Sequence, residues 1–173
     1  MEFGDRESFA VEIDLDELYE GVWLYGKFSY WINGCQVGDY NLGTSLRDVL
    51  FQMKWIVFDC GSRDGGILCK YSPQKVFSWL DGVLYGSTDC DIGSEVELPD
   101  TPARFDIKIS VDIFDEWKIY LIECCDNATI LFKSTNDSDI RVVSIVVGIF
   151  DSVIKDAYNY LNELYEREVA KSS

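Results

Sequence analysis

The sequence of 173 residues contains no histidine. This absence excludes every catalytic mechanism that needs an imidazole, including the Ser-His-Asp and Cys-His types, and it removes the commonest protein ligand of zinc and iron. Long hydrophobic runs are also missing, since no stretch of about 18 uncharged apolar residues, the length that spans a bilayer, occurs. Residues 1–7 are acidic, whereas a secretory signal is basic and then apolar. We therefore expect a cytoplasmic protein that enters no membrane.

Basic residues are scarce. The 15 Lys and Arg residues stand against 31 Asp and Glu residues, and the resulting net charge of −16 repels nucleic acids and anionic membranes, which are therefore poor partners. The chain is nevertheless 47% hydrophobic and 14% aromatic, which is enough apolar surface for a packed core and unlike a disordered acidic tail. A chain of this length can bury roughly 70% of its unfolded surface in one core. We predict a single domain over residues 1–173.

Six cysteines raise the question of a disulfide framework. Secreted domains held by disulfides are usually shorter than about 80 residues, and the reducing cytosol keeps thiols reduced. No pair has the C-x-x-C spacing of a structural zinc site, and no base near any cysteine suggests a nucleophile. We therefore expect buried thiols that act as small hydrophobic residues, with neither disulfide nor metal, at Cys35, Cys60, Cys69, Cys90, Cys124 and Cys125.

The N-terminal part of the chain has strand patterns. Phe9, Val11 and Ile13 alternate with more polar neighbours, which predicts a half-buried strand over residues 8–14. A second strand over residues 22–33 runs into Asn33-Gly34, a strong hairpin signal, and residues 35–40 return as its partner. Gly26 inside the second strand indicates a bulge or a close backbone approach. The aromatic residues between Trp23 and Tyr40 favour a sheet that is packed on helices on one side and partly covered on the other, over an exposed binding face.

Helical periods follow in three places. Apolar spacing after a capping Thr44 or Ser45 predicts a helix to about Phe58, and residues 59–66 form a polar, glycine-rich loop. Ser72-Pro73 begins a second helix that ends near residues 85–86, and a third helix runs from Gly148 to about residue 169. Residues 86–102 carry acidic groups without lysine or arginine, so we expect an acidic surface connection there.

The remaining segments are predicted strands. Residues 104–115 have the cleanest alternation in the chain, and with residues 117–125 and 129–134 they predict an antiparallel meander of three strands. Residues 140–147 are rich in β-branched side chains and are also predicted to be extended. The order βββ-αα-βββ-α implies an α+β fold, with an antiparallel sheet of about six strands and helices packed on one face.

Acidic residues gather in two segments, before residue 21 and between residues 86 and 102. One interpretation is a solvated face that keeps the protein soluble, and the other is a negative surface that steers toward a basic partner. The candidate binding residues are Asp14, Asp16, Glu17, Glu20, Asp89, Asp91, Glu95 and Glu97. A catalytic carboxylate pair such as Asp14 with Asp16 is a weaker alternative, because 31 carboxylates make any such choice unselective.

Several short segments together resemble a known family. They read FGD at residues 3–5, GVWLYGKF at 21–28, YWING at 30–34, GDY at 38–40, LGTSLRD at 42–48 and FDSVIKDAYNYL at 150–161. The sequence resembles immunity-protein family 42 of the bacterial polymorphic toxin systems, and the similarity is strongest in the N-terminal third of the chain.

The resemblance implies a function. Members are encoded beside toxins, including those of contact-dependent growth inhibition, and protect the producing cell by binding the cognate toxin domain. They are inhibitors and not enzymes, so the resemblance implies no cofactor, no metal and no catalytic residue. We therefore expect a cytoplasmic immunity protein that neutralises a basic toxin domain, such as a nuclease, by stoichiometric occlusion; the oligomeric state stays open. The alternatives are an acidic adaptor or regulatory domain for another basic protein and, third, a small carboxylate hydrolase.

Overall fold

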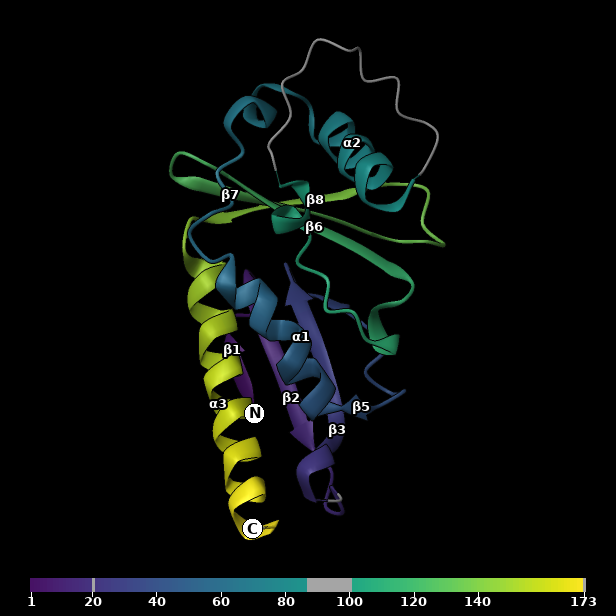
Figure 1. The fold of residues 1–173 in the computed structure, drawn as a ribbon. Coiled ribbons are helices and arrows are strands. Elements are labelled where there is room, and N and C mark those ends of the chain that lie inside the picture. Colours follow the sequence, from purple (N-terminus) through teal and green to yellow (C-terminus); the bar gives the residue numbers. More distant parts are fainter. Residues whose placement is uncertain (20, 87–100, 173) are drawn as a thin grey trace. The chain divides into compact units, whose positions relative to one another are not determined.

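The computed structural model describes residues 1–19, 21–86 and 101–172 (Figure 1). The chain divides into two compact units. Unit 1 comprises Met1–Cys60, Ile109–Glu116 and Gly148–Ser173, and unit 2 comprises Gly61–Lys108 and Trp117–Val147. Each unit is built from separate stretches of the chain, so neither is a contiguous piece. The single domain over residues 1–173 stays a prediction.

Unit 1 contains an antiparallel sheet of five strands with the order β1-β2-β3-β4, and β5 pairs with β3. The strands are β1 (Glu2–Gly4), β2 (Phe9–Leu15), β3 (Tyr25–Ile32), β4 (Cys35–Val37) and β5 (Thr44–Ser45). The predicted hairpin is confirmed, because Ile32 pairs with Cys35 and the two loop residues, Asn33 and Gly34, have φ values of 48° and 74°. β3 begins later than predicted, since Gly21–Trp23 form a short 3₁₀ helix, η1.

One face of this sheet is apolar and the other is polar. Val11 pairs with Tyr30 in the β2–β3 register, and both side chains are buried on the apolar face. Helix α3 covers this face, where the rings of Phe9 and Phe150 lie 4.8 Å apart. On the opposite face the Trp31 indole donates a hydrogen bond of 2.8 Å to Glu12. The predicted two-sided arrangement of the aromatic residues is therefore confirmed for this part of the sheet.

Helices α1 (Leu46–Phe58) and α3 (Ile149–Ser172) pack against each other and on the sheet of unit 1 (Figure 1). Ser45 caps α1 by accepting a hydrogen bond of 3.3 Å from the backbone N–H of Asp48. It is one of the two residues that were predicted as the cap. The predicted inner face of α1 is buried, from Leu46 to Ile56. Among the residues that the structure describes, no helix has the length and apolar character needed to cross a membrane.

Unit 2 packs one helix on a second antiparallel sheet. Ser72 caps α2 (Pro73–Tyr85) as predicted, and Gly86 ends it with a left-handed φ of 71°. The sheet has the order β6-β7-β8, formed by β6 (Trp117–Cys124), β7 (Asn127–Ser134) and β8 (Arg141–Val146). The extended structure predicted over residues 140–147 is thus confirmed as β8. The α+β class is confirmed, with the strands divided over two sheets rather than one.

The prediction of a strand over residues 104–115 is wrong. Two short 3₁₀ helices, η3 (Pro102–Phe105) and η4 (Asp112–Phe114), lie at the ends of this segment. Within the described residues, the segment pairs with a strand only through one isolated β-bridge, between Asp106 and Tyr120. The alternating Ile107 and Ile109 are nevertheless buried. Alternation reports which side chains are buried, whereas a strand also needs a partner backbone along its length. The third strand of the meander is β8 instead.

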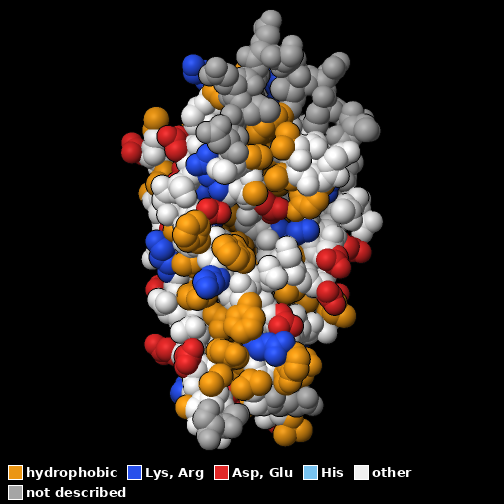
Figure 2. Space-filling model, in the orientation of Figure 1, with side chains coloured by type: hydrophobic (Ala, Val, Ile, Leu, Met, Phe, Trp, Pro, Cys, Tyr) orange, Lys and Arg blue, Asp and Glu red, His pale blue; other side chains and the backbone are white. Residues whose placement is uncertain are grey.

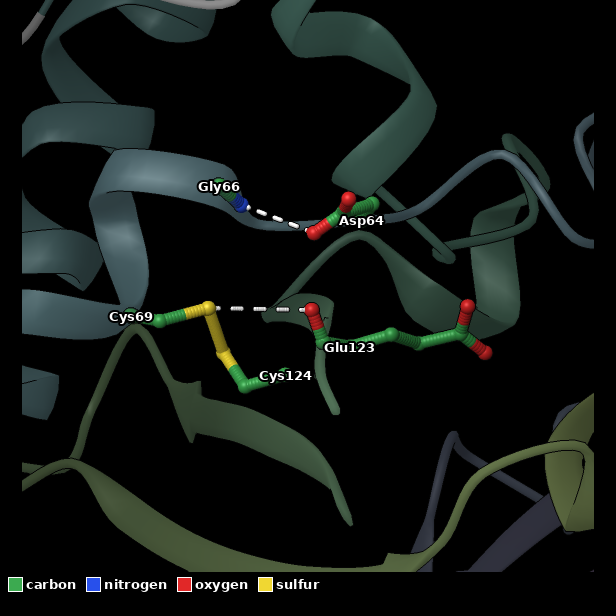
Figure 3. Close-up of a disulfide and its surroundings, with 5 residues drawn as sticks. All are labelled: Asp64, Gly66, Cys69, Glu123 and Cys124. Atoms are coloured by element: carbon green, nitrogen blue, oxygen red, sulfur yellow. Dashed lines mark hydrogen bonds between the residues drawn. A yellow bond between two sulfur atoms is a disulfide. The ribbon is translucent and has the colours of Figure 1, made fainter. Parts of the chain in front are cut away.

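The expectation that all cysteines are buried thiols is wrong. Cys69 and Cys124 form a disulfide, with Cα atoms 5.9 Å apart (Figure 3). Cys125 is exposed, Cys35 and Cys60 are half-buried, and none of these three is part of the disulfide. Cys90 lies outside the described residues.

A close backbone approach brings the two bridged cysteines together across 55 positions of sequence. The short 3₁₀ helix η2 (Gly66–Lys70) carries Cys69, and just before it the N–H of Gly65 donates a hydrogen bond of 2.8 Å to the carbonyl of Glu123 on β6. A Cβ atom at position 65 would lie 2.3 Å from Ile122 Cγ2, so only glycine permits this approach. The spacing of the cysteines in the sequence does not indicate that Cys69 and Cys124 lie close together.

Candidate functional site

Three of the predicted acidic residues, Asp14, Asp16 and Glu17, lie together at the end of β2, and all three are exposed. Asp14 pairs with Lys27 on the polar face of the sheet. Neither Asp14 nor Asp16 has the enclosed setting that a pair of catalytic carboxylates needs. The other predicted residues, Glu20, Asp89, Asp91, Glu95 and Glu97, lie outside the described residues.

The acidic turn after β2 is bonded to an aromatic pair. The N–H of Asp16 donates a hydrogen bond of 3.0 Å to the carbonyl of Tyr25. The Tyr25 ring is stacked beside that of Trp23, with centroids 6.5 Å apart and planes 12° from parallel. Arg47, in the first turn of α1, places its guanidinium carbon 3.5 Å from the centre of the Trp23 ring. Backbone bonds and ring contacts thus join the acidic turn to the start of α1.

The outer face of α1 carries a row of exposed aromatic side chains. Phe51, Trp55 and Phe58 are 48%, 65% and 80% exposed, and their spacing of four and three residues puts them on one side of the helix. We name these three residues the aromatic row. Figure 2 shows hydrophobic side chains gathered over the part of the molecule where α1 lies. At its first member, the Phe51 ring contacts the Tyr165 ring of α3 at 5.4 Å.

Sequence reasoning missed the aromatic row. The periodicity that predicts α1 also identifies its buried side, and the row lies on the other side of the same helix. The signal was present, because Phe51, Trp55 and Phe58 form a second apolar stripe at helical spacing. A helix with apolar residues on both sides is usually enclosed, so such a stripe on a helix left in water indicates a surface for another molecule.

A shallow pocket of about 500 Å³ lies beside the aromatic pair. Its walls include the Trp23 and Tyr25 rings, and Asp48 and Asp112 supply two carboxylates. No lysine or arginine is among the residues that line it. We name it the Trp23 pocket. Arg47 is paired with Asp48 and lies against the Trp23 ring. Asp112 and the Tyr25 ring are therefore the lining groups that favour a further positively charged group.

Unit 2 holds a separate cluster of paired polar groups. Lys118 and the Tyr120 hydroxyl both donate hydrogen bonds to Asp81, and the Tyr85 hydroxyl donates one to Asp106. Burial raises the pKa of the Asp106 carboxyl, and the hydrogen bond from Tyr85 offsets part of that rise. Burial also raises the pKa of Tyr85 and of Tyr120. These groups satisfy one another, so the cluster stabilises the contact between α2 and β6.

Arg63 is a buried charge that the sequence did not single out. It is fully buried, although it lies in a polar loop, and its Nε donates a hydrogen bond of 2.9 Å to the carbonyl of Arg104. In the part of the chain that the structure describes, no group of three or more Cys, Asp or Glu side chains is arranged to hold a metal ion.

The exposed apolar side chains of the aromatic row and the lining of the Trp23 pocket favour recognition of another molecule.

Comparisons with known proteins agree with the fold. No curated protein matches the sequence. The structure is similar to the crystal structure of CdiI from Burkholderia dolosa AUO158, with a TM-score of 0.72 and 21% sequence identity over 92% of this chain and 99% of that chain. At this identity the likeness concerns the fold. A sequence model of the family described as Immunity protein 42 matches residues 1–160, and because this match spans most of the sequence, the chain belongs to the immunity protein 42 family.

Proposed function

We propose that this protein binds and neutralises a cognate bacterial toxin domain by stoichiometric occlusion. The observation that carries the proposal is the family match over residues 1–160. The likeness in fold to a CdiI protein supports a toxin of a contact-dependent growth inhibition system. The protein acts in the cytoplasm of the producing cell and carries out no turnover of its own.

The charge of the protein supports a basic partner. A net charge of −16 favours a toxin domain whose substrate cleft attracts anions, as in a nuclease. Long-range attraction speeds the encounter, whereas a few desolvated anchor side chains set the lifetime of the complex. The acidic residues proposed to contribute to this attraction are Asp14, Asp16, Glu17, Glu20, Asp89, Asp91, Glu95 and Glu97.

Two other functions compete with this proposal. An acidic adaptor for a different basic protein would use the same charge, and the identity of the bound protein separates the two. A carboxylate hydrolase would need a catalytic pair in a cleft. The Trp23 pocket has two carboxylates, but Asp48 is held 2.9 Å from Arg47 Nη2 and the pocket is shallow, which favours binding over hydrolysis.

The test is co-expression with a candidate toxin domain, which we expect to be encoded beside this chain's gene. We expect the host to survive and the two proteins to co-purify in a 1:1 complex. An unrelated acidic protein of similar net charge is the control, and it should give no protection. Death of the host despite expression of the protein would refute the proposal, and survival without a complex would refute occlusion.

A further inference from the structure

We propose that the aromatic row and the Trp23 pocket together form the surface that grips the toxin domain. This inference rests on the proposed function and adds the location and chemistry of the contact. The matching surface of the toxin domain is an apolar patch bordered by a lysine or arginine side chain. The patch covers the aromatic row, and the cationic side chain enters the Trp23 pocket.

Helix α1 has two apolar sides, and only one of them is buried in the fold. Its inner side packs into the core of unit 1, where Leu46, Val49 and Met53 are fully buried. Its outer side leaves Trp55 and Phe58 mostly in water, at 65% and 80% exposure. Contiguous exposed apolar side chains on a folded chain mark interaction sites, whereas scattered single ones need no explanation.

This surface also has the amino-acid composition and the ordered side chains that are typical of a binding anchor. Tryptophan, tyrosine and arginine dominate the energetics of protein interfaces, and Trp23, Tyr25, Arg47 and Trp55 all belong to this surface. Arg47 holds the Trp23 ring at 3.5 Å, so this side chain loses little freedom when a partner binds.

Charge complementarity identifies the occupant. Asp112 and Tyr25 line the Trp23 pocket, whereas the carboxylate of Asp48 is already paired with Arg47. A lysine or arginine of a partner would meet the Asp112 carboxylate and the Tyr25 ring there. A second copy of this chain would instead bring another net charge of −16 to the same surface, which opposes self-association.

The test compares the affinities of variants for the toxin domain identified by the co-expression test, measured with the purified full-length protein. We expect Trp55→Ser and Phe58→Ser each to raise the Kd at least about tenfold, mainly through faster dissociation. We expect Asp112→Asn to raise the Kd and to weaken its dependence on salt. Val146→Ser, which removes a side chain that is 61% exposed on β8, is the matched control and should bind like the wild type. Circular dichroism and thermal unfolding verify that each variant is folded.

The outcomes separate the two levels of the proposal. If the wild type binds and protects while Trp55→Ser and Phe58→Ser bind with the wild-type Kd, the surface is wrongly assigned and the proposed function stands. If the wild type neither binds nor protects, the proposed function fails and the inference fails with it. Light scattering of the wild type should show a monomer, and a dimer that Trp55→Ser dissociates would assign the row to a second copy and overturn the inference.

Discussion

The guanidinium group of Arg47 lies between an aromatic ring and a carboxylate: its central carbon is 3.5 Å from the centre of the Trp23 ring, and Nη2 is 2.9 Å from Asp48 Oδ1. This arrangement ties the first turn of α1 to η1 and keeps a ring that is 43% exposed in one orientation. Trp23 is therefore an ordered wall of the Trp23 pocket and not a loose surface side chain.

Removal of the Arg47 charge should loosen that wall. We expect Arg47→Met, which keeps most of the aliphatic stem, to lower the free energy of unfolding by roughly 0.5–1 kcal/mol, because a cation–π contact at an exposed site is lost. The Kd for the toxin domain should also rise several-fold. Urea unfolding and a binding titration measure the two effects. Arg141→Met is the control, because it removes an arginine that also lies near an aromatic ring, at 5.7 Å from Phe132. Wild-type behaviour of Arg47→Met in both assays would contradict the role assigned to Arg47.

Charge reversal in the acidic turn should slow association. We expect Asp16→Lys with Glu17→Lys to reduce the association rate at low salt and to flatten its dependence on ionic strength, while the dissociation rate changes little. Stopped-flow mixing with the toxin domain measures both rates. Asp126→Lys with Asp139→Lys reverses two exposed acids outside the proposed set, so it changes the net charge by the same amount and controls for net charge alone. An association rate that responds neither to salt nor to these reversals would defeat the steering role.

The disulfide should stabilise the fold without affecting the proposed contact. It closes a loop of 55 positions, so the loss of chain entropy predicts a stabilisation of about 4 kcal/mol relative to the reduced protein. We expect Cys69→Ser, or a reducing agent, to lower the melting temperature, whereas Cys125→Ser leaves it near that of the wild type. Binding of the toxin domain should persist in the reduced protein, because neither cysteine belongs to the aromatic row or the Trp23 pocket. Loss of binding on reduction would contradict this separation.

The buried carboxyl of Asp106 should make stability depend on pH. Burial is the main reason that the pKa of Asp106 lies above the ordinary 3.8. The favourable contribution of this carboxyl to the free energy of unfolding is therefore complete below pH 3.8, and it is lost as the pH rises through the pKa that Asp106 has in the folded protein. Asparagine carries no charge, and its single Oδ1 can accept from the N–H of Lys108 while its Nδ2 donates to the Tyr85 hydroxyl oxygen. We therefore expect Asp106→Asn to be more stable than the wild type at pH 7, with a difference that shrinks toward pH 4. Chemical unfolding between pH 4 and pH 7 measures this difference in stability, and Asp139→Asn, at an exposed position, is the control. A difference that stays constant with pH would exclude titration of Asp106 as the cause.

A side chain at position 26 should strain the sheet of unit 1. The predicted close approach at Gly26 is confirmed, because a Cβ there would lie 2.3 Å from the carbonyl oxygen of Asp14 and 2.9 Å from Leu46 Cδ1. We expect Gly26→Ala to lower the free energy of unfolding by about 2 kcal/mol, as overpacking in a core does. Lys27→Ala, at the next position of β3, should cost far less. Equal stability of the two variants in urea would show that β2 and β3 adjust without strain.

The sequence predicted most elements correctly where neighbouring residues carry the information. Ser45 and Ser72 cap the helices that follow them, and Asn33-Gly34 closes its hairpin, because each of these features involves residues a few positions apart. The binding residues chosen from the sequence stay a prediction. Acidic composition led to Asp14, Asp16 and Glu17, whereas the aromatic row was overlooked, because an apolar residue on a predicted helix is ordinarily assigned to the core.

Local structure and overall charge were determined by the sequence alone: the helices, the hairpin, the α+β class and the acidic character of the protein. Tertiary structure alone decided that Cys69 meets Cys124, that residues 104–115 join neither sheet as a strand, and that Phe51, Trp55 and Phe58 stay in water. The physical reason is common to all three. A disulfide, a strand ladder and a buried face each depend on what lies opposite in space, and a chain does not encode that in the spacing of its neighbours.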